Sequence, residues 1–123
     1  MPAKQPTQRQ LQGKAAENAA CQFLVTQGLK LLEQNFLCKL GEIDLILMDG
    51  QTLVFTEVRF RKNPNFGGAA ASVTPGKQRK LQRAAQVYLQ RTGQIPACRF
   101  DVLAMTQDQN SQIICENWIK NAF

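Results

Sequence analysis

Histidine is absent from this sequence of 123 residues. Its absence excludes every mechanism that uses an imidazole, including Ser–His and Cys–His nucleophiles, and every mixed Cys/His zinc site. Apolar runs long enough to cross a bilayer are also absent, and the polar, basic start lacks the apolar stretch of a secretory signal. We therefore expect a cytoplasmic protein with no membrane partner.

Close pairs of cysteines are absent as well. The four cysteines, Cys21, Cys38, Cys98 and Cys115, are widely scattered, and none has the spacing of a zinc knuckle. Disulfides are rare in a reducing cytosol. We therefore expect four buried thiols that act as small apolar side chains.

Acidic residues are missing between Arg59 and Arg99, in a chain with a formal net charge of +6. The basic residues of this interval are Arg59, Arg61, Lys62, Lys77, Arg79, Lys80, Arg83, Arg91 and Arg99. A run with one sign of charge attracts phosphate and releases counterions when it binds. The helix expected in this region lacks the broad bulky face that insertion into a membrane surface needs. We therefore expect nucleic acid, in the first place DNA, as the partner.

What is present is the pattern of a single α/β domain. Residues 1–10 are expected to form a flexible basic arm, and residues 11–123 one domain. The expected elements are a helix over residues 7–27, strands over 29–36, 41–48 and 52–60, a helix from Thr74-Pro75 to residue 92, and strands over 97–105 and 112–116. The order is α-β-β-β-α-β-β.

The central hairpin of this pattern is apolar on both faces. One face carries Ile43, Leu45, Leu47, Val54 and Val58, and the other carries Ile46, Met48, Leu53 and Phe55. A sheet that is apolar on both sides must be covered on both sides. We therefore expect a three-layer α/β/α architecture with a central mixed sheet between the two helices.

Two acids of the hairpin, Asp44 and Glu57, are predicted to share a face of the sheet. If Asp49-Gly50 is a two-residue turn, Asp44 lies opposite Phe55 and Glu42 lies opposite Glu57. Asp44 and Glu57 are then diagonal neighbours, about 7–8 Å apart at the backbone. Both side chains can reach one ion between them.

Acids on an apolar sheet face oppose folding unless a cation or a donor compensates them. Mg²⁺ (or Mn²⁺) suits such a pair, because it takes one or two carboxylates and keeps several waters. The alternative is structural. Asp44 and Glu57 can also lie solvated at strand ends, or pair with Arg59 or Arg99.

The segments GEIDLI, FTEVRFRKNPNFG, VTPGKQRKL, RFDVL and WIKNAF follow one another in this sequence. Together they resemble the YraN-like family of bacterial proteins, over residues 13–123. The resemblance implies a restriction-endonuclease-like fold, related to archaeal Holliday-junction resolvases and to the PD-(D/E)xK nucleases. It also implies that Asp44 and Glu57 bind the metal, and that Glu17, in GKAAENAA, helps to hold the metal or its waters.

Arg59 departs from the nuclease motif, which has lysine at this position. Arginine can stabilise charge, but it stays protonated and its planar fork has a different shape. Two interpretations therefore stay open: a Mg²⁺-dependent nuclease acting on structured or branched DNA, and a nucleic-acid-binding module that has lost efficient catalysis. A scaffold that binds an acidic protein is a third. A homodimer is expected only by analogy with the resolvases.

Further basic residues are candidates for phosphate contact: Arg61, Lys62, Lys77, Arg79, Lys80 and Arg83. Lys77, which the resemblance matches to a family lysine, is expected to point inwards near the acids, whereas Arg79 and Arg83 lie on a more exposed stripe. Phe66 is a candidate for base stacking, with core packing as its alternative. Trp118 and Phe123 are expected to be packing or oligomer contacts.

Overall fold

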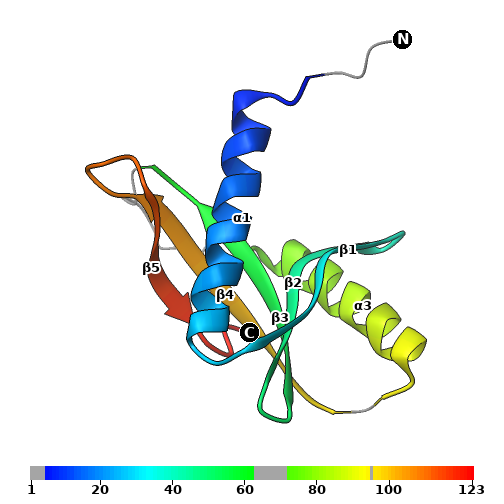
Figure 1. Ribbon diagram of the computed structural model, residues 1–123. Coiled ribbons are helices and arrows are strands. Elements are labelled where there is room, and N and C mark those ends of the chain that lie inside the picture. The colour runs from blue at the N-terminus through cyan, green and yellow to red at the C-terminus, as the bar shows by residue number, and fades with distance from the viewer. Residues whose placement is uncertain (1–4, 63–71, 95) are drawn as a thin grey trace.

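The computed structural model describes residues 5–62, 72–94 and 96–123. In these residues the chain forms, in order, α1 (Gln8–Thr26), β1 (Lys30–Cys38), β2 (Gly41–Asp49), β3 (Thr52–Phe60), α3 (Pro75–Thr92), β4 (Ala97–Gln107) and β5 (Ile113–Ile119) (Figure 1). This confirms the predicted order α-β-β-β-α-β-β.

Both helices begin and end where their capping residues dictate. Thr7 and Gln10 form a capping box at the start of α1, so the helix begins inside the predicted arm. At α3, the Thr74 side chain accepts a hydrogen bond from the backbone N–H of Lys77, and Pro75 occupies the first turn. The helix ends at Gly93, whose φ of 71° favours glycine.

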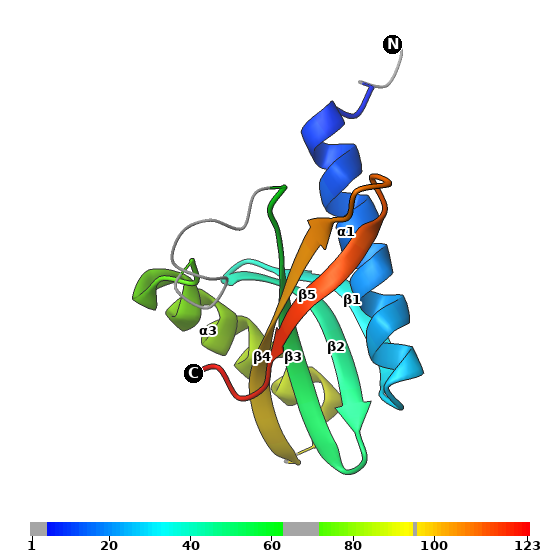
Figure 2. The same ribbon diagram turned by 90° about the vertical axis from the view of Figure 1, so that its left-hand side faces the viewer.

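The five strands form one mixed sheet in the order β1-β2-β3-β4-β5. Neighbouring strands are antiparallel except β3 and β4, which are parallel. A parallel pair needs a long crossover connection, and α3 lies in that connection. Figures 1 and 2 show α1 on one face of the sheet and α3 on the other, as predicted for a sheet with two apolar faces.

Two clusters of buried side chains hold these layers together. On the α3 side, Leu81 and Ala84 pack with Phe55 and Ile46. On the α1 side, Ala20 and Leu24 pack with residues of the strands. The buried residues that the central hairpin contributes to this cluster are Leu45, Leu47 and Val54.

Ile43 belongs to the α3-side cluster, so its predicted place beside Leu45 is wrong. The pairing of β1 with β2 skips Asn35 and Asp44, and Asn35 has a φ of 58°. The strict alternation of faces on which the prediction relied is interrupted at that point.

The register of the central hairpin differs from the prediction by two residues. Asp49 pairs with Thr52, so the turn consists of Gly50 and Gln51 rather than Asp49-Gly50. Phe55 consequently pairs with Ile46, and its predicted place opposite Asp44 is wrong. Carried one step past Leu45 and Thr56, this register sets Asp44 opposite Glu57, so the predicted diagonal relation of the two acids and the predicted place of Glu42 opposite Glu57 are also wrong.

The four cysteines are free thiols, as predicted, but the prediction that they are buried is wrong. Cys98 is exposed, and Cys21, Cys38 and Cys115 are partly exposed. Cys115 lies on the edge strand β5, and Cys38 is the last residue of the other edge strand.

None of the helices in the described part of the chain combines the length and apolar character that a membrane crossing requires.

Candidate functional site

Asp44 lies where β2 and β3 separate. The paired residues of the two strands run from Asp49 and Thr52 to Leu45 and Thr56. Beyond the last pair, the Asp44 carboxylate accepts a hydrogen bond of 2.8 Å from the backbone N–H of Val58. The side chain therefore takes the place of a backbone acceptor and lies between the two strands.

Glu57 lies on β3 at the point where β2 and β3 separate, which we call the fork of β2 and β3. The residue is only 5% exposed. Its Oε1 atom lies 3.5 Å from Arg59 Nη2 and 3.7 Å from Lys77 Nζ. Its Oε2 atom is buried and has no hydrogen-bond partner. The prediction that Lys77 points inwards to the acids is confirmed.

The two carboxylates share one poorly solvated place. Burial and the charge of Asp44 raise the pKa of Glu57 to about 7, against the lowering effect of Lys77 and Arg59. Burial also raises the pKa of Asp44, against the lowering effect of the hydrogen bond from Val58. The cations present therefore do not compensate the acids fully.

Glu17 approaches this pair from α1. Gln34 of β1 donates a hydrogen bond of 3.3 Å to its carboxylate, so the Glu17 side chain lies towards the sheet. Burial and the charge of Asp44 raise the pKa of Glu17. Its part in metal binding stays a prediction.

Within the described residues, no set of three or more His, Cys, Asp or Glu side chains is arranged to hold a metal ion. A metal would therefore rely on Asp44 and Glu57 alone. One or two carboxylates are the number that Mg²⁺ uses, and the unpartnered Oε2 of Glu57 is the type of donor it prefers. The donor chemistry of this pair fits such an ion.

A cleft of about 690 Å³ opens between the first turns of α1 and the end of β3; we call it the basic cleft. The described residues that line it are Arg9, Gln12, Gly13, Val58, Arg59, Phe60, Arg61 and Lys62, and none of these is acidic. Arg61 is anchored there by its backbone N–H, which donates to the carbonyl of Met105 on β4. The basic cleft therefore offers several positive charges in a concave space.

The predicted phosphate-binding residues divide between several surfaces. Arg61 and Lys62 line the basic cleft, and Lys77 faces the acids. Three residues of α3, Arg79, Lys80 and Arg83, are exposed and do not line the cleft. Phe66 and its loop lie outside the described residues.

Three lining residues of α1 were not predicted. Arg9, Gln12 and Gly13 are spaced as neighbours on one face of a helix, which was the available signal. The prediction assigned residues 1–10 to a flexible arm, so Arg9 was not considered part of a site. Phe60 was missed because strand alternation alone does not show that its ring borders a cleft.

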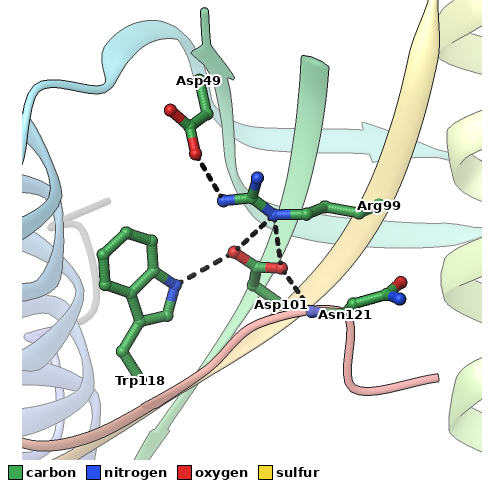
Figure 3. A network of polar contacts seen from close by, with 5 residues as sticks. All are labelled: Asp49, Arg99, Asp101, Trp118 and Asn121. Carbon is green, nitrogen blue, oxygen red and sulfur yellow. Dashed lines mark hydrogen bonds and ion pairs between the residues drawn. The ribbon is translucent and has the colours of Figure 1, made fainter.

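A second polar cluster, shown in Figure 3, surrounds Asp101 on β4. Its carboxylate accepts hydrogen bonds from Arg99 Nε, from Trp118 Nε1 and from the backbone N–H of Asn121. Arg99 Nη2 also lies 2.9 Å from the carboxylate of Asp49. Arg99 therefore pairs with Asp101 and Asp49, and not with the acids of the fork.

Trp118 and Phe123 are packing residues, in agreement with the first of the two alternatives predicted for them. The ring of Trp118 packs edge-on against Phe23 of α1, with 6.0 Å between the ring centroids. Phe123 stacks on Phe100 at 5.0 Å. Both contacts fasten the C-terminal residues to the domain.

Comparison with known proteins identifies the family. A family model described as uncharacterised protein family UPF0102 matches residues 16–105, which include Glu17, Asp44, Glu57 and Lys77. A UPF0102 protein of Herminiimonas arsenicoxydans is 53% identical over 116 residues, which cover 94% of this chain and 89% of that protein. A UPF0102 protein of Nitrosococcus oceani is 47% identical over 120 residues, covering 96% and 95%. The YraN-like resemblance is thereby confirmed, and the chain belongs to the UPF0102 family.

Proposed function

We propose that this protein is a Mg²⁺-dependent nuclease-like protein that binds and cuts structured or branched DNA. One observation carries the proposal: Glu57 is buried beside Asp44, and one of its oxygens has no hydrogen-bond partner. Unpaired buried carboxylates are costly, and they persist where a ligand compensates them. The α-β-β-β-α-β-β order and the mixed sheet are compatible with kinship to the restriction-endonuclease-like nucleases.

A divalent cation held by Asp44 and Glu57 would supply charge neutralisation and an acidified water, the chemistry that phosphodiester hydrolysis requires. The protein's own groups prepare this place. The backbone N–H of Val58 fixes the Asp44 carboxylate between β2 and β3. Lys77 and Arg59 hold Oε1 of Glu57, which leaves Oε2 as the free donor atom.

Lys77 can take the role of the lysine that the nuclease motif has at the position of Arg59. The nuclease motif places a lysine on the strand, where this chain has an arginine that cannot give up its proton. Lys77 brings an ammonium group from α3 to within 3.7 Å of the same carboxylate. We therefore assign to Lys77 the positioning and charge-stabilising role that the motif gives to its strand lysine, and this favours the nuclease over the impaired binding module.

The test is cleavage of end-labelled branched and duplex DNA with Mg²⁺, Mn²⁺ or EDTA. We expect metal-dependent cutting that falls by roughly a hundredfold or more in Asp44→Asn and Glu57→Gln, because each loses a charged metal donor. Glu116→Gln, at an exposed position on β5, is the matched control and should cut at the wild-type rate. Cutting that persists in EDTA or in Glu57→Gln would contradict the proposal.

The impaired binding module is the second candidate, because Arg59 lies 3.5 Å from Glu57 and can substitute for a cation there. In that case the wild-type protein binds DNA but does not cut it with either metal, and Arg59→Lys gains metal-dependent cutting. Lys77→Met tests the role assigned to Lys77, and it should abolish cutting by the nuclease.

A further inference from the structure

We infer that the basic cleft binds an unpaired strand of DNA, so that the preferred substrate is a duplex with a single-stranded flap or splayed branch. This inference rests on the proposed function and specifies its substrate. Its starting point is the composition of the lining, whose described residues include Arg9, Arg61 and Lys62 and no acid. Such a lining attracts the phosphates of a nucleic acid.

The size of the cleft selects a single strand. Its volume of about 690 Å³ is that of a site for a small molecule or a few nucleotides. A duplex is too wide to enter a space of this size between one helix and one strand end. Single strands are bound in basic grooves of this kind, which follow the backbone.

Phe60 supplies a surface for a base. The residue is half-buried: it packs against the α1-side cluster and also lines the cleft. Aromatic rings interleaved with basic residues stack on bases of any sequence. Gly13, on the α1 side, leaves open space where a side chain would begin. The cleft therefore combines charge, an aromatic surface and room.

Two residues of β3 connect the cleft with the acid pair, although neither acid lines it. Arg59 lines the cleft and lies 3.5 Å from Glu57, and Val58 lines it and donates its backbone N–H to Asp44. A strand bound in the cleft would therefore lie one residue away from the acids.

The experiment measures binding in EDTA, so that no cutting occurs, by fluorescence anisotropy of the full chain. The probes are a labelled single strand, a blunt duplex and the same duplex carrying a flap. We expect the single strand and the flap to bind at least about tenfold more tightly than the blunt duplex. Stacking on Phe60 should contribute at least about fivefold, which Phe60→Leu removes while it keeps apolar packing.

A pair of substitutions at Gly13 isolates the cleft. Gly13→Glu and Gly13→Gln add side chains of similar size to a helical position with open space, and both favour the helix over glycine. Gly13→Glu should weaken flap binding about tenfold more than Gly13→Gln, because only it places a negative charge in the cleft. Arg61→Gln should reduce the salt dependence of single-strand binding by about 0.7 in log–log slope. Lys39→Gln, an exposed charge between β1 and β2, is the control and should leave that slope unchanged.

Two results would overturn the inference: a blunt duplex that binds as tightly as the flap, or equal binding by Gly13→Glu and Gly13→Gln. Failure of the proposed function looks different. Flap-specific binding that needs the cleft, without metal-dependent cutting, removes the nuclease and keeps the inference. Metal-dependent cutting of blunt duplex that is unaffected by Gly13→Glu keeps the nuclease and removes the inference.

Discussion

Two carboxylates of this protein are buried to a similar degree, and their surroundings differ. Asp101 is 1% exposed and Glu57 is 5% exposed. Asp101 accepts hydrogen bonds from a guanidinium, an indole and a backbone amide, all within 3.2 Å (Figure 3). Glu57 has cations only at 3.5 and 3.7 Å, on one oxygen, and no partner on the other.

The difference separates a structural charge from a site that needs a ligand. A buried charge whose donors are complete is part of the fold, because nothing further is required to compensate it. The donors of Asp101 come from β4, from β5 and from the tail after it, so the network fastens the C-terminal residues to the sheet. Glu57 has incomplete compensation, and its neighbour Arg59 lines the basic cleft. We therefore read it as the functional carboxylate of the two.

The strongest test of this comparison is removal of the structural carboxylate. Asp101→Ala should lower the free energy of unfolding by about 3–5 kcal/mol, because it removes the acceptor of Arg99 Nε and of the N–H groups of Trp118 and Asn121. Urea unfolding of the metal-free protein measures the change. Glu57→Gln should not destabilise the protein in the same experiment at pH 8. An equal loss in both variants would mean that the two carboxylates are alike.

The pH dependence of stability should reveal Glu57 next. The folded protein keeps a proton on Glu57 up to about pH 7, whereas the unfolded chain releases it near pH 4.5. The folded state binds more protons between these values, so metal-free stability should fall as pH rises through this interval, by at most about 3 kcal/mol.

Urea unfolding of the wild type and of Glu57→Gln at pH 5 and pH 8 measures this fall. Glu57→Gln should flatten the wild-type slope, because glutamine does not titrate. Glu116→Gln, at an exposed position, is the control and should leave the slope unchanged. Wild-type stability that rises over the same interval would contradict the raised pKa of Glu57.

The Asp101 network was harder to predict than the candidate functional site, for a physical reason. Strand alternation placed Glu57 on an apolar face, and helical spacing placed Lys77 towards it, because both patterns are local. The partners of Asp101 are 17 and 20 residues away along the chain, and no local pattern joins them. The family resemblance added the metal roles of the acids, which the spacing alone left open.

Long-range packing also limited the details of the candidate site. The turn lies at Gly50 and Gln51, and this shift of two residues brings Asp44 opposite Glu57 instead of diagonal to it, while both acids stay near one another. Arg9 joins the basic cleft only because α1 crosses the end of β3, a contact that its own sequence neighbourhood does not encode. The fold class and the order of elements were predictable, whereas the cleft required the tertiary structure.

The removal of a single donor from each carboxylate compares Asp101 and Glu57 more finely. Trp118→Phe removes the indole N–H that donates to Asp101 at 3.0 Å and keeps an aromatic ring against Phe23. It should cost about 2 kcal/mol of unfolding free energy, as for other hydrogen bonds to a charged group. Lys77→Met, which removes a partly exposed cation from Glu57, is the matched change at the other carboxylate and should cost less. The opposite order would show that Lys77 is a structural group.

The smallest effect is the one most specific to the functional carboxylate. Mg²⁺ at about ten times its dissociation constant should stabilise the folded protein by about 1.4 kcal/mol, since the ion binds the folded state alone. The gain should be present at pH 8 and absent at pH 5, where Glu57 holds its proton. Thermal unfolding in MgCl₂ against NaCl of equal ionic strength measures it, and Glu57→Gln should lose the gain while Glu116→Gln keeps it. If Mg²⁺ stabilised Glu57→Gln as much as the wild type, the ion would bind at a site other than Glu57. In that case the unpaired oxygen of Glu57 would be a defect of packing, and the contrast with Asp101 would carry no functional meaning.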